Sequence, residues 1–356
     1  MSRIKKKLGI WGSLLLVLAL VMTAVFPATA LATTYPITVT DHLGREVTIV
    51  ELPVKIISLA PSITEILFAL GLGDRVVGVT DYCDYPPEAL EKEKIGGWWD
   101  PDAEKIVALQ PDLLISAYGY QHDAITALEG LGLKIFDTKA TDLDTLLDDI
   151  NTIGYITDKE EEAEALIAEM QNRIDAVTSK TAGLSLEEKP GVFHICWGPT
   201  GGIVTSGSGT FIHDLIENAG GVNIFADFEG WPTVDLEAII ARNPEVIIVT
   251  AMGGTAGDTW EWVNTEPRLA DVSARKNGRV YYVESNWVER PGPRIVLGLE
   301  QMAKYIHPEL FFDPWDYDKD ESGTIEKSEA IKAVQDYFNG LIAKVQTIQV
   351  VMLYFG

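Results

Sequence analysis

An acidic loop near the C-terminus has the spacing of a metal-binding loop. It runs from Asp318 to Glu329 and reads D-K-D-E-S-G-T-I-E-K-S-E. Oxygen-bearing side chains stand at its first, third, fifth, ninth and twelfth positions, and glycine at the sixth permits a sharp turn. Carboxylates this dense repel each other without a cation, so the spacing predicts a Ca²⁺ site. Its ligands would be Asp318, Asp320, Ser322, Thr324 (through its backbone carbonyl), Glu326 and Glu329.

A second set of chemical groups occurs twice. Trp98–Ile115 reads W-W-D-P-D-A-E-K-I-V-A-L-Q-P-D-L-L-I, and Trp231–Ile248 reads W-P-T-V-D-L-E-A-I-I-A-R-N-P-E-V-I-I. The copies share an aromatic, an acid six residues later (Glu104 and Glu237) and a Pro before an apolar run, at one offset (231 − 98 = 133). Each copy predicts a loop, a short helix and a buried strand. The protein therefore contains one supersecondary unit in each of two similar lobes.

Aromatic residues gather in the loops that join strands to helices. This many flat apolar side chains in such loops indicate a cleft for a broad, flat ligand. They are Tyr82, Trp98, Trp99, Tyr118, Trp197, Trp231 and Trp287.

Catalytic motifs are missing from the sequence. It contains no G-x-S-x-G, no H-E-x-x-H and no P-loop, so we expect no enzyme activity. The histidines lack ligand spacing, and only His122 lies in a polar, aromatic-rich loop where it could reach a cleft as a metal ligand. Cys83 and Cys196 are expected to be separate buried thiols. A formal net charge of −25 argues against nucleic acid and anionic membranes as partners.

The N-terminus resembles a secretory signal peptide over residues 1–32. A basic segment precedes the apolar run Leu14–Phe26, and Ala30-Leu31-Ala32 is a small-x-small cleavage site. No cysteine stands at that site, which argues against a lipid anchor. We expect export to the periplasm or to the cell surface.

Between these features, predicted strands alternate with helices. Such alternation is typical of α/β folds with parallel sheets. Pro61–Glu65 predicts a helix start capped by Ser62 with Glu65 three residues later. Asp158–Val177 has no Gly or Pro and predicts one long helix between the lobes.

The expected architecture is two similar α/β lobes joined by that helix, followed by a tail that resembles half of an EF-hand, as in dockerin-type loops. We expect two helices behind the calcium loop, at Ser328–Asn339 and Ala343–Phe355. The domains would be an N-terminal lobe at 36–152, a connecting helix at 153–182, a C-terminal lobe at 183–308 and the tail at 313–356.

Four stretches resemble a known family. They are Lys55–Pro87, G-G-W-W-D-P-D-x-E, G-W-P-x-V-D-L-E and S-N-W-V-E-R-P-G-P-R. All resemble the extracytoplasmic substrate-binding proteins of ABC importers, in the helical-strut class and closest to its vitamin B12-binding members. The resemblance extends from Ile37 to about His307, and the class also serves haem and ferric siderophores.

The resemblance implies roles for individual residues. Tyr82, Trp98, Trp231, Asn286 and Arg290 match positions that contact the corrin ring, although Asn286 stands where a B12-binding protein carries Asp. The family's next cleft Trp falls at Ala117, beside Tyr118. Glu104 and Glu237 match the two acids that dock onto arginines of the membrane permease.

These observations predict a secreted, monomeric binding protein. It captures a corrinoid in the inter-lobe cleft and delivers it to an ABC importer without catalysis. Two alternatives stay open: a haem or ferric-siderophore carrier of the same class, and a cell-surface interaction protein that binds its partner through the calcium tail.

Overall fold

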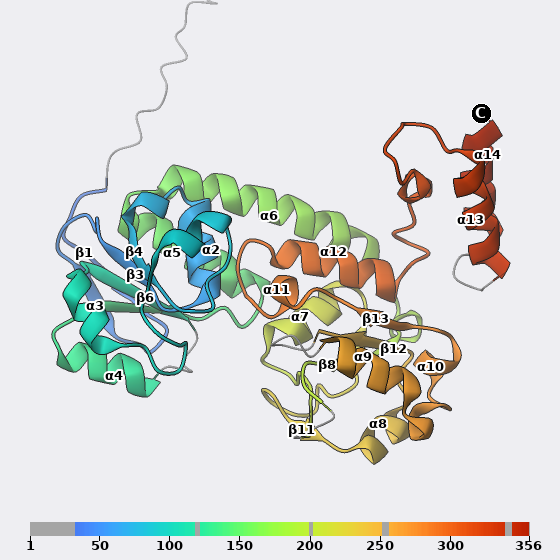
Figure 1. Cartoon of the computed structure of the whole chain (residues 1–356), viewed down its shortest axis with the longest axis horizontal. Helices are drawn as coiled ribbons and strands as arrows, with labels where there is room; N and C mark the ends of the chain where they lie inside the picture. The colour runs from blue at the N-terminus through green and yellow to red at the C-terminus, as the bar shows by residue number, and fades with distance from the viewer. Residues whose placement is uncertain (1–32, 118–121, 199–201, 251–255, 339–343, 356) are drawn as a thin grey trace, which may run out of the picture. The chain divides into compact units, whose positions relative to one another are not determined.

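The structure is a computed structural model that describes residues 33–117, 122–198, 202–250, 256–338 and 344–355 (Figure 1). Tyr118, the segment 1–32 and the other remaining residues lie outside these ranges. The described residues from Tyr35 onward form one compact unit. Within the described ranges, every helix is too short or too polar to cross a bilayer.

The first sheet has five parallel strands. Their order is β5 (Glu93–Lys94), β4 (Val76–Val79), β3 (Ile56–Ser58), β6 (Leu113–Ala117) and β7 (Ile135–Thr138). Helices cover both faces, so the central strands β4, β3 and β6 are largely apolar rather than alternating. One face packs on α2 (Pro61–Ala69) and α5 (Leu143–Thr157), and the other on α3 (Ala103–Leu109) and α4 (His122–Gly130). An antiparallel hairpin of β1 (Ile37–Thr40) and β2 (Glu46–Ile49) precedes it.

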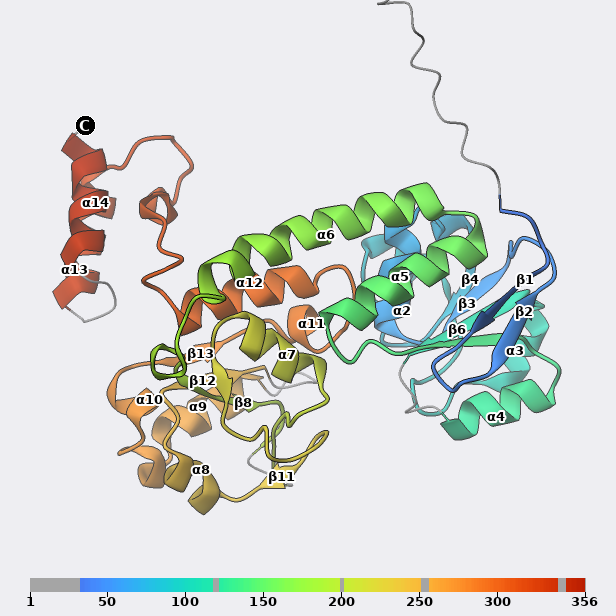
Figure 2. The same ribbon diagram turned by 180° about the vertical axis from the view of Figure 1, so that it is seen from behind.

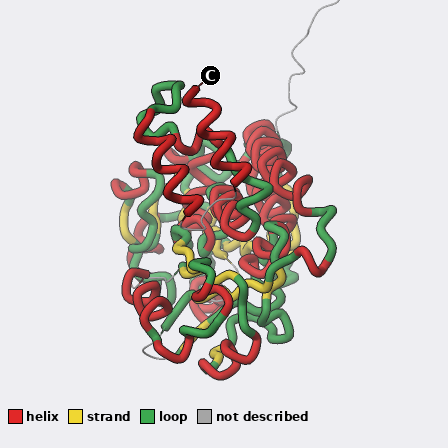
Figure 3. Tube along the Cα trace, turned by 90° about the vertical axis from the view of Figure 1, so that its right-hand side faces the viewer, coloured by secondary structure: helices red, strands yellow, loops and turns green. Residues whose placement is uncertain are grey.

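The second sheet has four parallel strands. Their order is β10 (Val222–Asn223), β8 (Gly191–Ile195), β12 (Val246–Val249) and β13 (Val280–Tyr282). One face packs on α7 (Phe211–Asn218) and α12 (Ile295–Ile306). The other packs on α8 (Leu236–Arg242), α9 (Ala256–Thr265) and α10 (Ser273–Lys276). A small antiparallel pair joins β9 (Ile203–Val204) to β11 (Thr233–Val234), and α11 (Ser285–Val288) follows β13. Figure 3 shows strand segments flanked by helices.

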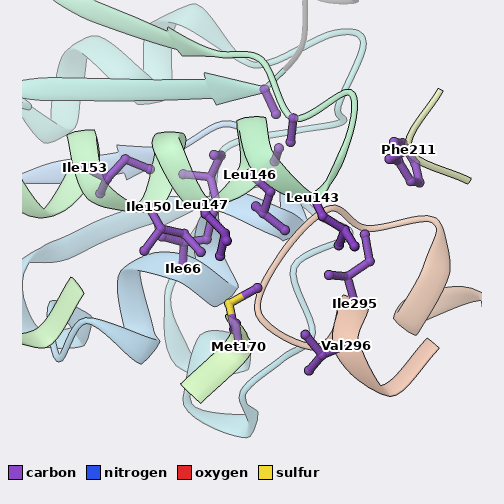
Figure 4. Close-up of a cluster of buried hydrophobic side chains, with 14 of the residues drawn as sticks. Ile66, Leu143, Leu146, Leu147, Ile150, Ile153, Met170, Phe211, Ile295 and Val296 are labelled. Atoms are coloured by element: carbon purple, nitrogen blue, oxygen red, sulfur yellow. The ribbon is translucent and has the colours of Figure 1, made fainter. Parts of the chain in front are cut away.

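A long helix, α6 (Glu160–Thr181), runs from the first sheet to the second (Figure 2). It packs on α5 and on α12, and Arg173 pairs with Glu300 of α12 at 2.8 Å. Figure 4 shows Met170 of α6 near side chains of α2, α5 and α12. The apolar core on the α6 side therefore continues from one sheet to the other, and we call it the shared core. Each sheet also has its own outer core on the opposite face.

The predicted α/β class with parallel sheets is confirmed. The sequence also predicts helices at Phe211–Asn218 and Ile295–Ile306, and α7 and α12 have these bounds. Two local predictions are wrong. Ala60, not Ser62, precedes the first turn of α2, because Pro61 occupies the first helical position without needing an N–H donor. Asp158 does not begin α6; it ends α5 in a left-handed conformation (φ 58°).

The tail contains a single turn at η6 (Pro314–Tyr317) and two helices, α13 (Lys327–Phe338) and α14 (Lys344–Phe355). The helices pack together around a small core of Ile325, Ala330, Ala333 and Val350. The two predicted tail helices are confirmed to within a residue at each end.

Candidate functional site

The repeated unit folds in the same way in both lobes. Asp102 caps α3 and Asp235 caps α8, and each side chain accepts a hydrogen bond from the backbone N–H three residues later, at 3.1 Å and 2.7 Å. Gln110 and Asn243 end the two helices in the left-handed region, at φ 52° and 44°. Each of these pairs keeps the offset of 133 that the sequence repeat shows. A polar cap and a left-handed exit therefore fix both short helices against their sheets.

The two repeated tryptophans hold similar positions. Trp98 and Trp231 are half-buried, and both pack against the shared core. Trp98 lies 4.6 Å from Trp99, centroid to centroid, and Trp231 lies 5.8 Å from Phe211 in an edge-on arrangement. Each indole is thus oriented by a neighbouring aromatic ring, which limits its rotation.

The other predicted aromatic residues differ in exposure. Tyr82, Trp99 and Trp197 are exposed, whereas Trp287 is half-buried on the shared core. Tyr118 lies outside the described residues. His122 begins α4, but its side chain is not described, so its role as a metal ligand stays a prediction.

Arg290 joins the two lobes. Its guanidinium lies 2.5 Å from the carboxylate of Asp84 and donates to the carbonyl of Tyr82 at 3.4 Å. The structure thus brings two predicted ligand-contact residues, Arg290 and Tyr82, into one place. Burial pushes the pKa of Asp84 upward, but the hydrogen bond and charge of Arg290 outweigh it and hold that pKa below its usual range. Asn286, four residues earlier, is half-buried in α11.

A second inter-lobe contact lies beside the first. Arg294 holds the carboxylate of Glu65 with two hydrogen bonds, at 2.8 Å and 2.6 Å, and its guanidinium stacks 3.8 Å from the ring of Tyr85. Burial raises the pKa of Glu65, and Arg294 opposes that rise. This pair was not predicted from the sequence. The available signal was an acid on the apolar helix α2 and two arginines four residues apart.

A pocket of about 590 Å³ adjoins this contact. It is lined by residues of α2, α6 and α12 and by the Tyr85–Glu88 segment, including Glu65, Met170 and Arg294. None of the aromatic residues predicted to bind ligand lines it. The pocket lies beside α6, so it is a different surface from the predicted aromatic site, which stays a prediction.

The second lobe has a buried polar chain at the carboxyl ends of its strands. His194 lies 2.9 Å from the hydroxyl of Thr250, which donates to Glu289. Burial raises the pKa of Glu289 to about 8 and lowers that of His194 to about 3, so both side chains are mostly neutral at pH 7. Within the described part of the chain, one oxygen of Glu289 and Nδ1 of His194 are buried without a hydrogen-bond partner.

The two cysteines are free and buried, as predicted. Thr64 and Thr80 hydrogen-bond to Cys83, at 3.0 Å and 3.1 Å. Burial raises the pKa of both thiols, and the negative charge of Glu289 adds to the rise for Cys196. Both thiols are therefore protonated and unreactive at neutral pH.

The repeated acids are exposed. Glu104 and Glu237 stand in the first turns of α3 and α8, where the helix dipole favours a negative charge. Glu237 is 75% exposed and lies 3.8 Å from Arg268, which is also exposed. Among the described residues, Glu104 has no ion pair within 4 Å. Neither acid contacts the shared core, so both are accessible to a partner.

The tail loop gathers carboxylates. Oxygens of Asp318, Asp320 and Glu329 lie within 4.8 Å of one another, and Gly323 has a φ of 77°. Glu326 is not in this group. The hydroxyl of Ser322 donates to the carbonyl of Thr324 at 3.0 Å. Three of the predicted ligands are thus brought together around the turn that the glycine permits, and these residues fit a hard cation.

Comparisons with known proteins agree on the family of this fold. The profile of the family described as "Periplasmic binding protein" matches residues 56–286. The uncharacterized ABC transporter substrate-binding lipoprotein YvrC of Bacillus subtilis is 33% identical over 318 residues, 86% of this chain and 99% of that protein.

Two solved structures share the fold. The periplasmic vitamin B12 binding protein BtuF of Vibrio cholerae is 30% identical with a TM-score of 0.64, covering 73% of this chain and 99% of that one. The periplasmic heme-binding protein RhuT of Roseiflexus sp. RS-1, in its apo form, is 26% identical with a TM-score of 0.64, covering 72% of this chain and 98% of that one.

Proposed function

This chain belongs to the periplasmic binding protein family, and on that premise we propose that it captures a corrinoid in its inter-lobe cleft. As a substrate-binding protein of an ABC importer it works with a membrane permease and carries a small molecule. Transport rather than catalysis is the activity of such a protein. The corrinoid, the residues that hold it and the exported location that follows from cleavage after residue 32 are parts of our proposal.

The observation that carries the corrinoid proposal is the set of aromatic rings at the ends of the strands. Tyr82, Trp99 and Trp197 expose their rings, and Trp98 and Trp231 are set by neighbouring aromatics at matched positions in the two lobes. Flat rings of this size bury large apolar areas against a planar ligand. The vitamin B12-binding name of the Vibrio cholerae relative supports a corrin over other flat ligands.

Arg290 would bind the polar rim of that ligand. Its present partners, Asp84 and the Tyr82 carbonyl, come from the opposite lobe. An amide or phosphate group of a corrinoid can replace those acceptors, because a guanidinium offers five donors in a planar fork. Asn286 and Trp287, one turn before it, would complete this rim.

Haem is the second candidate ligand. The similarity to a heme-binding protein of known structure favours haem, because that protein binds a flat iron-containing ring with the same fold. His122 is the histidine that the sequence offers as its axial ligand.

Glu104 and Glu237 are proposed to dock the protein onto the permease. They are exposed, they occupy the same place in the two copies of the repeated unit, and they stand apart from the aromatic residues. A pair of like acids at one offset suits a partner that offers two like cations.

We also propose that the tail loop binds Ca²⁺ through Asp318, Asp320 and Glu329, with Ser322, Thr324 and Glu326 completing the twelve-residue pattern. Bound cation would neutralise these crowded carboxylates and stabilise the packing of α13 on α14. Glu329→Gln should abolish a calcium-dependent rise in the melting temperature. A rise that persists in that variant would show that the cation binds elsewhere.

The ligand proposal is tested by titrating cyanocobalamin, haemin and a ferric siderophore into separate samples of the purified protein. Calorimetry and the visible absorption of the ligand are recorded together. We expect one-to-one binding of cyanocobalamin, weakened at least tenfold in a Trp99→Ala, Trp197→Ala double variant. Trp315→Ala, at another exposed tryptophan that lies in the tail, is the control. Binding of haemin alone would show that the ligand is haem rather than a corrinoid. Binding of none of the three would refute the ligand proposal.

A further inference from the structure

Both repeated helices expose an aliphatic side chain one turn after the acid. Val107 follows Glu104 on α3 and is 45% exposed. Ile240 follows Glu237 on α8 and is 37% exposed. The two residues are related by the same offset as the acids (240 − 107 = 133). Exposed aliphatic residues are common singly, but this one recurs at the same position of a duplicated helix.

An exposed alanine completes the pattern on each helix. Ala108 and Ala241 follow directly after the aliphatic residues. Positions i, i+3 and i+4 share one face of an α-helix, so acid, aliphatic residue and alanine form a continuous surface. We call it the acid–aliphatic stripe: Glu104, Val107 and Ala108 on α3, and Glu237, Ile240 and Ala241 on α8.

The remaining positions of the helices show why the stripe is informative. Ile106 and Ile239 are fully buried, and they anchor each helix to the outer core of its sheet. Other positions differ between the copies: Lys105 corresponds to Ala238, and Leu109 to Arg242. The two helices thus share their buried anchor and their exposed stripe, and differ elsewhere. Packing explains the anchor but not the stripe, because stripe residues face solvent.

The two stripes lie away from the proposed ligand-binding residues. Both helices pack on outer cores, on the faces of the two sheets opposite α6 and the shared core. Trp98 and Trp231, in contrast, pack against the shared core. The stripes are therefore surfaces for a macromolecule rather than walls of the small-molecule site.

We propose that the two stripes are matched docking surfaces for the permease, in which Val107 and Ile240 contribute apolar contact beside the acids. This inference rests on the proposed function, which supplies the permease as the partner. A chain that presents the same surface twice fits a partner with two equal sockets, as in a two-fold permease. Each socket would offer a basic side chain next to an apolar hollow. A second copy of this chain fits less well, because pairing through one stripe would leave the other uncovered.

The test measures docking without ligand. Purified full-length protein is sedimented with right-side-out membrane vesicles from cells that contain its importer, and vesicles from a permease-deletion strain give the background. We expect Val107→Asp with Ile240→Asp to lower specific retention at least tenfold at both low and high salt. The conservative pair Val107→Leu with Ile240→Leu should retain wild-type binding. Glu104→Gln with Glu237→Gln should remove mainly the salt-sensitive part of the binding.

The matched control is Leu131→Asp with Leu186→Asp. It adds the same two charges at exposed aliphatic positions outside the repeat, where the leucines are 57% and 75% exposed. Equal retention of the Val107, Ile240 variant and wild type would overturn the inference, as would an equal loss in the control. Corrinoid binding by calorimetry is measured on the same samples and should be unchanged. A wild type that docks but binds no corrinoid would refute the ligand proposal and leave the docking inference standing.

Discussion

The two copies of the repeated unit share a backbone frame and differ in what surrounds it. Caps, left-handed exits and buried isoleucines coincide at one offset. The exposed acids do not have equal surroundings, since Glu237 has Arg268 at 3.8 Å and Glu104 has no such neighbour among the described residues. The comparison teaches that local backbone interactions preserve the frame, while residues from other segments set the electrostatics of each copy.

The polar interiors of the lobes differ in the same way. Ser58 on β3 lies opposite Ile115 of β6, and His194 on β8 lies opposite Ile248 of β12. Because Ile115 and Ile248 correspond in the repeat, Ser58 and His194 hold equivalent places in the two sheets. Ser58 is satisfied: its hydroxyl donates to the carbonyl of Ala60 and accepts from Thr64, both at 2.8 Å. His194 belongs to the hydrogen-bonded chain of side chains that ends at Glu289. That chain leaves Nδ1 of His194 and one oxygen of Glu289 buried without a hydrogen-bond partner among the residues that the structure describes. At this pair of positions the second lobe is therefore the less satisfied one.

The largest effects are expected from the buried anchors. Ile106→Ala and Ile239→Ala should each lower the free energy of unfolding by about 2–5 kcal/mol, because each leaves a cavity in a packed core. If the frames are equivalent, the two losses will agree to about 1 kcal/mol. Denaturant unfolding measures both, and a much smaller loss at one site would show that its outer core can collapse around the cavity.

Glu289→Gln tests the difference between the interiors. The folded-state pKa of Glu289, about 8, lies above its ordinary value of 4.5, so the folded protein holds a proton that the unfolded chain releases between these values. The contribution of Glu289 to stability should fall as pH rises through that window, and the glutamine variant should lack this part of the pH dependence. At pH 9 we expect the variant to be more stable than wild type.

Thermal melting from pH 5 to 9 measures this difference. Ser58→Ala in the first lobe is the control, and it should shift the whole curve without changing its dependence on pH. A wild-type melting temperature that is independent of pH between 6 and 9 would contradict the prediction.

The helix caps should have smaller and matched effects. Asp102→Ala and Asp235→Ala each remove one hydrogen bond at a helix start, and each should cost about 1 kcal/mol. Asparagine at either position can still accept that bond and should restore most of the stability. Unequal costs, read from chemical denaturation, would mean that the two frames depend on their caps to different degrees.

The smallest effect concerns the exposed acids. Arg268→Ala removes the neighbour of Glu237 and should leave stability within about 1 kcal/mol, because the pair is exposed and screened by solvent. It should strengthen vesicle docking about twofold at low salt, and the gain should vanish at high salt. Lys105→Ala, which removes an exposed cation from α3, is the control for the loss of one positive charge. No change at any ionic strength would show that Arg268 does not shield Glu237.

Much of this molecule could be predicted from its sequence because the relevant interactions are local. The repeat placed α3 and α8 and the strands that follow them, and apolar periodicity predicted the bounds of α7 and α12. The Ser62 cap was a local prediction that was wrong, because Pro61 can begin a helix without a side-chain cap.

Other features depend on residues far apart in the chain. Glu65 meets Arg294 across 229 positions, and Arg290 meets Asp84 across 206, so no local pattern could pair them. Tertiary structure also decided which predicted aromatic rings are exposed and which pack on the shared core.

By itself, the sequence determined that the chain is built from two copies of one unit, that each copy carries an aromatic and an acid at fixed spacing, and that both lobes are α/β. Hydrogen bonds and side-chain contacts within a few residues decide such features. Only the tertiary structure decided that the tryptophans lie on the shared core, that the acid–aliphatic stripes lie on the outer cores, and that four charged residues join the lobes. Those outcomes depend on which faces are buried when distant segments pack together, and burial is a property of the whole fold.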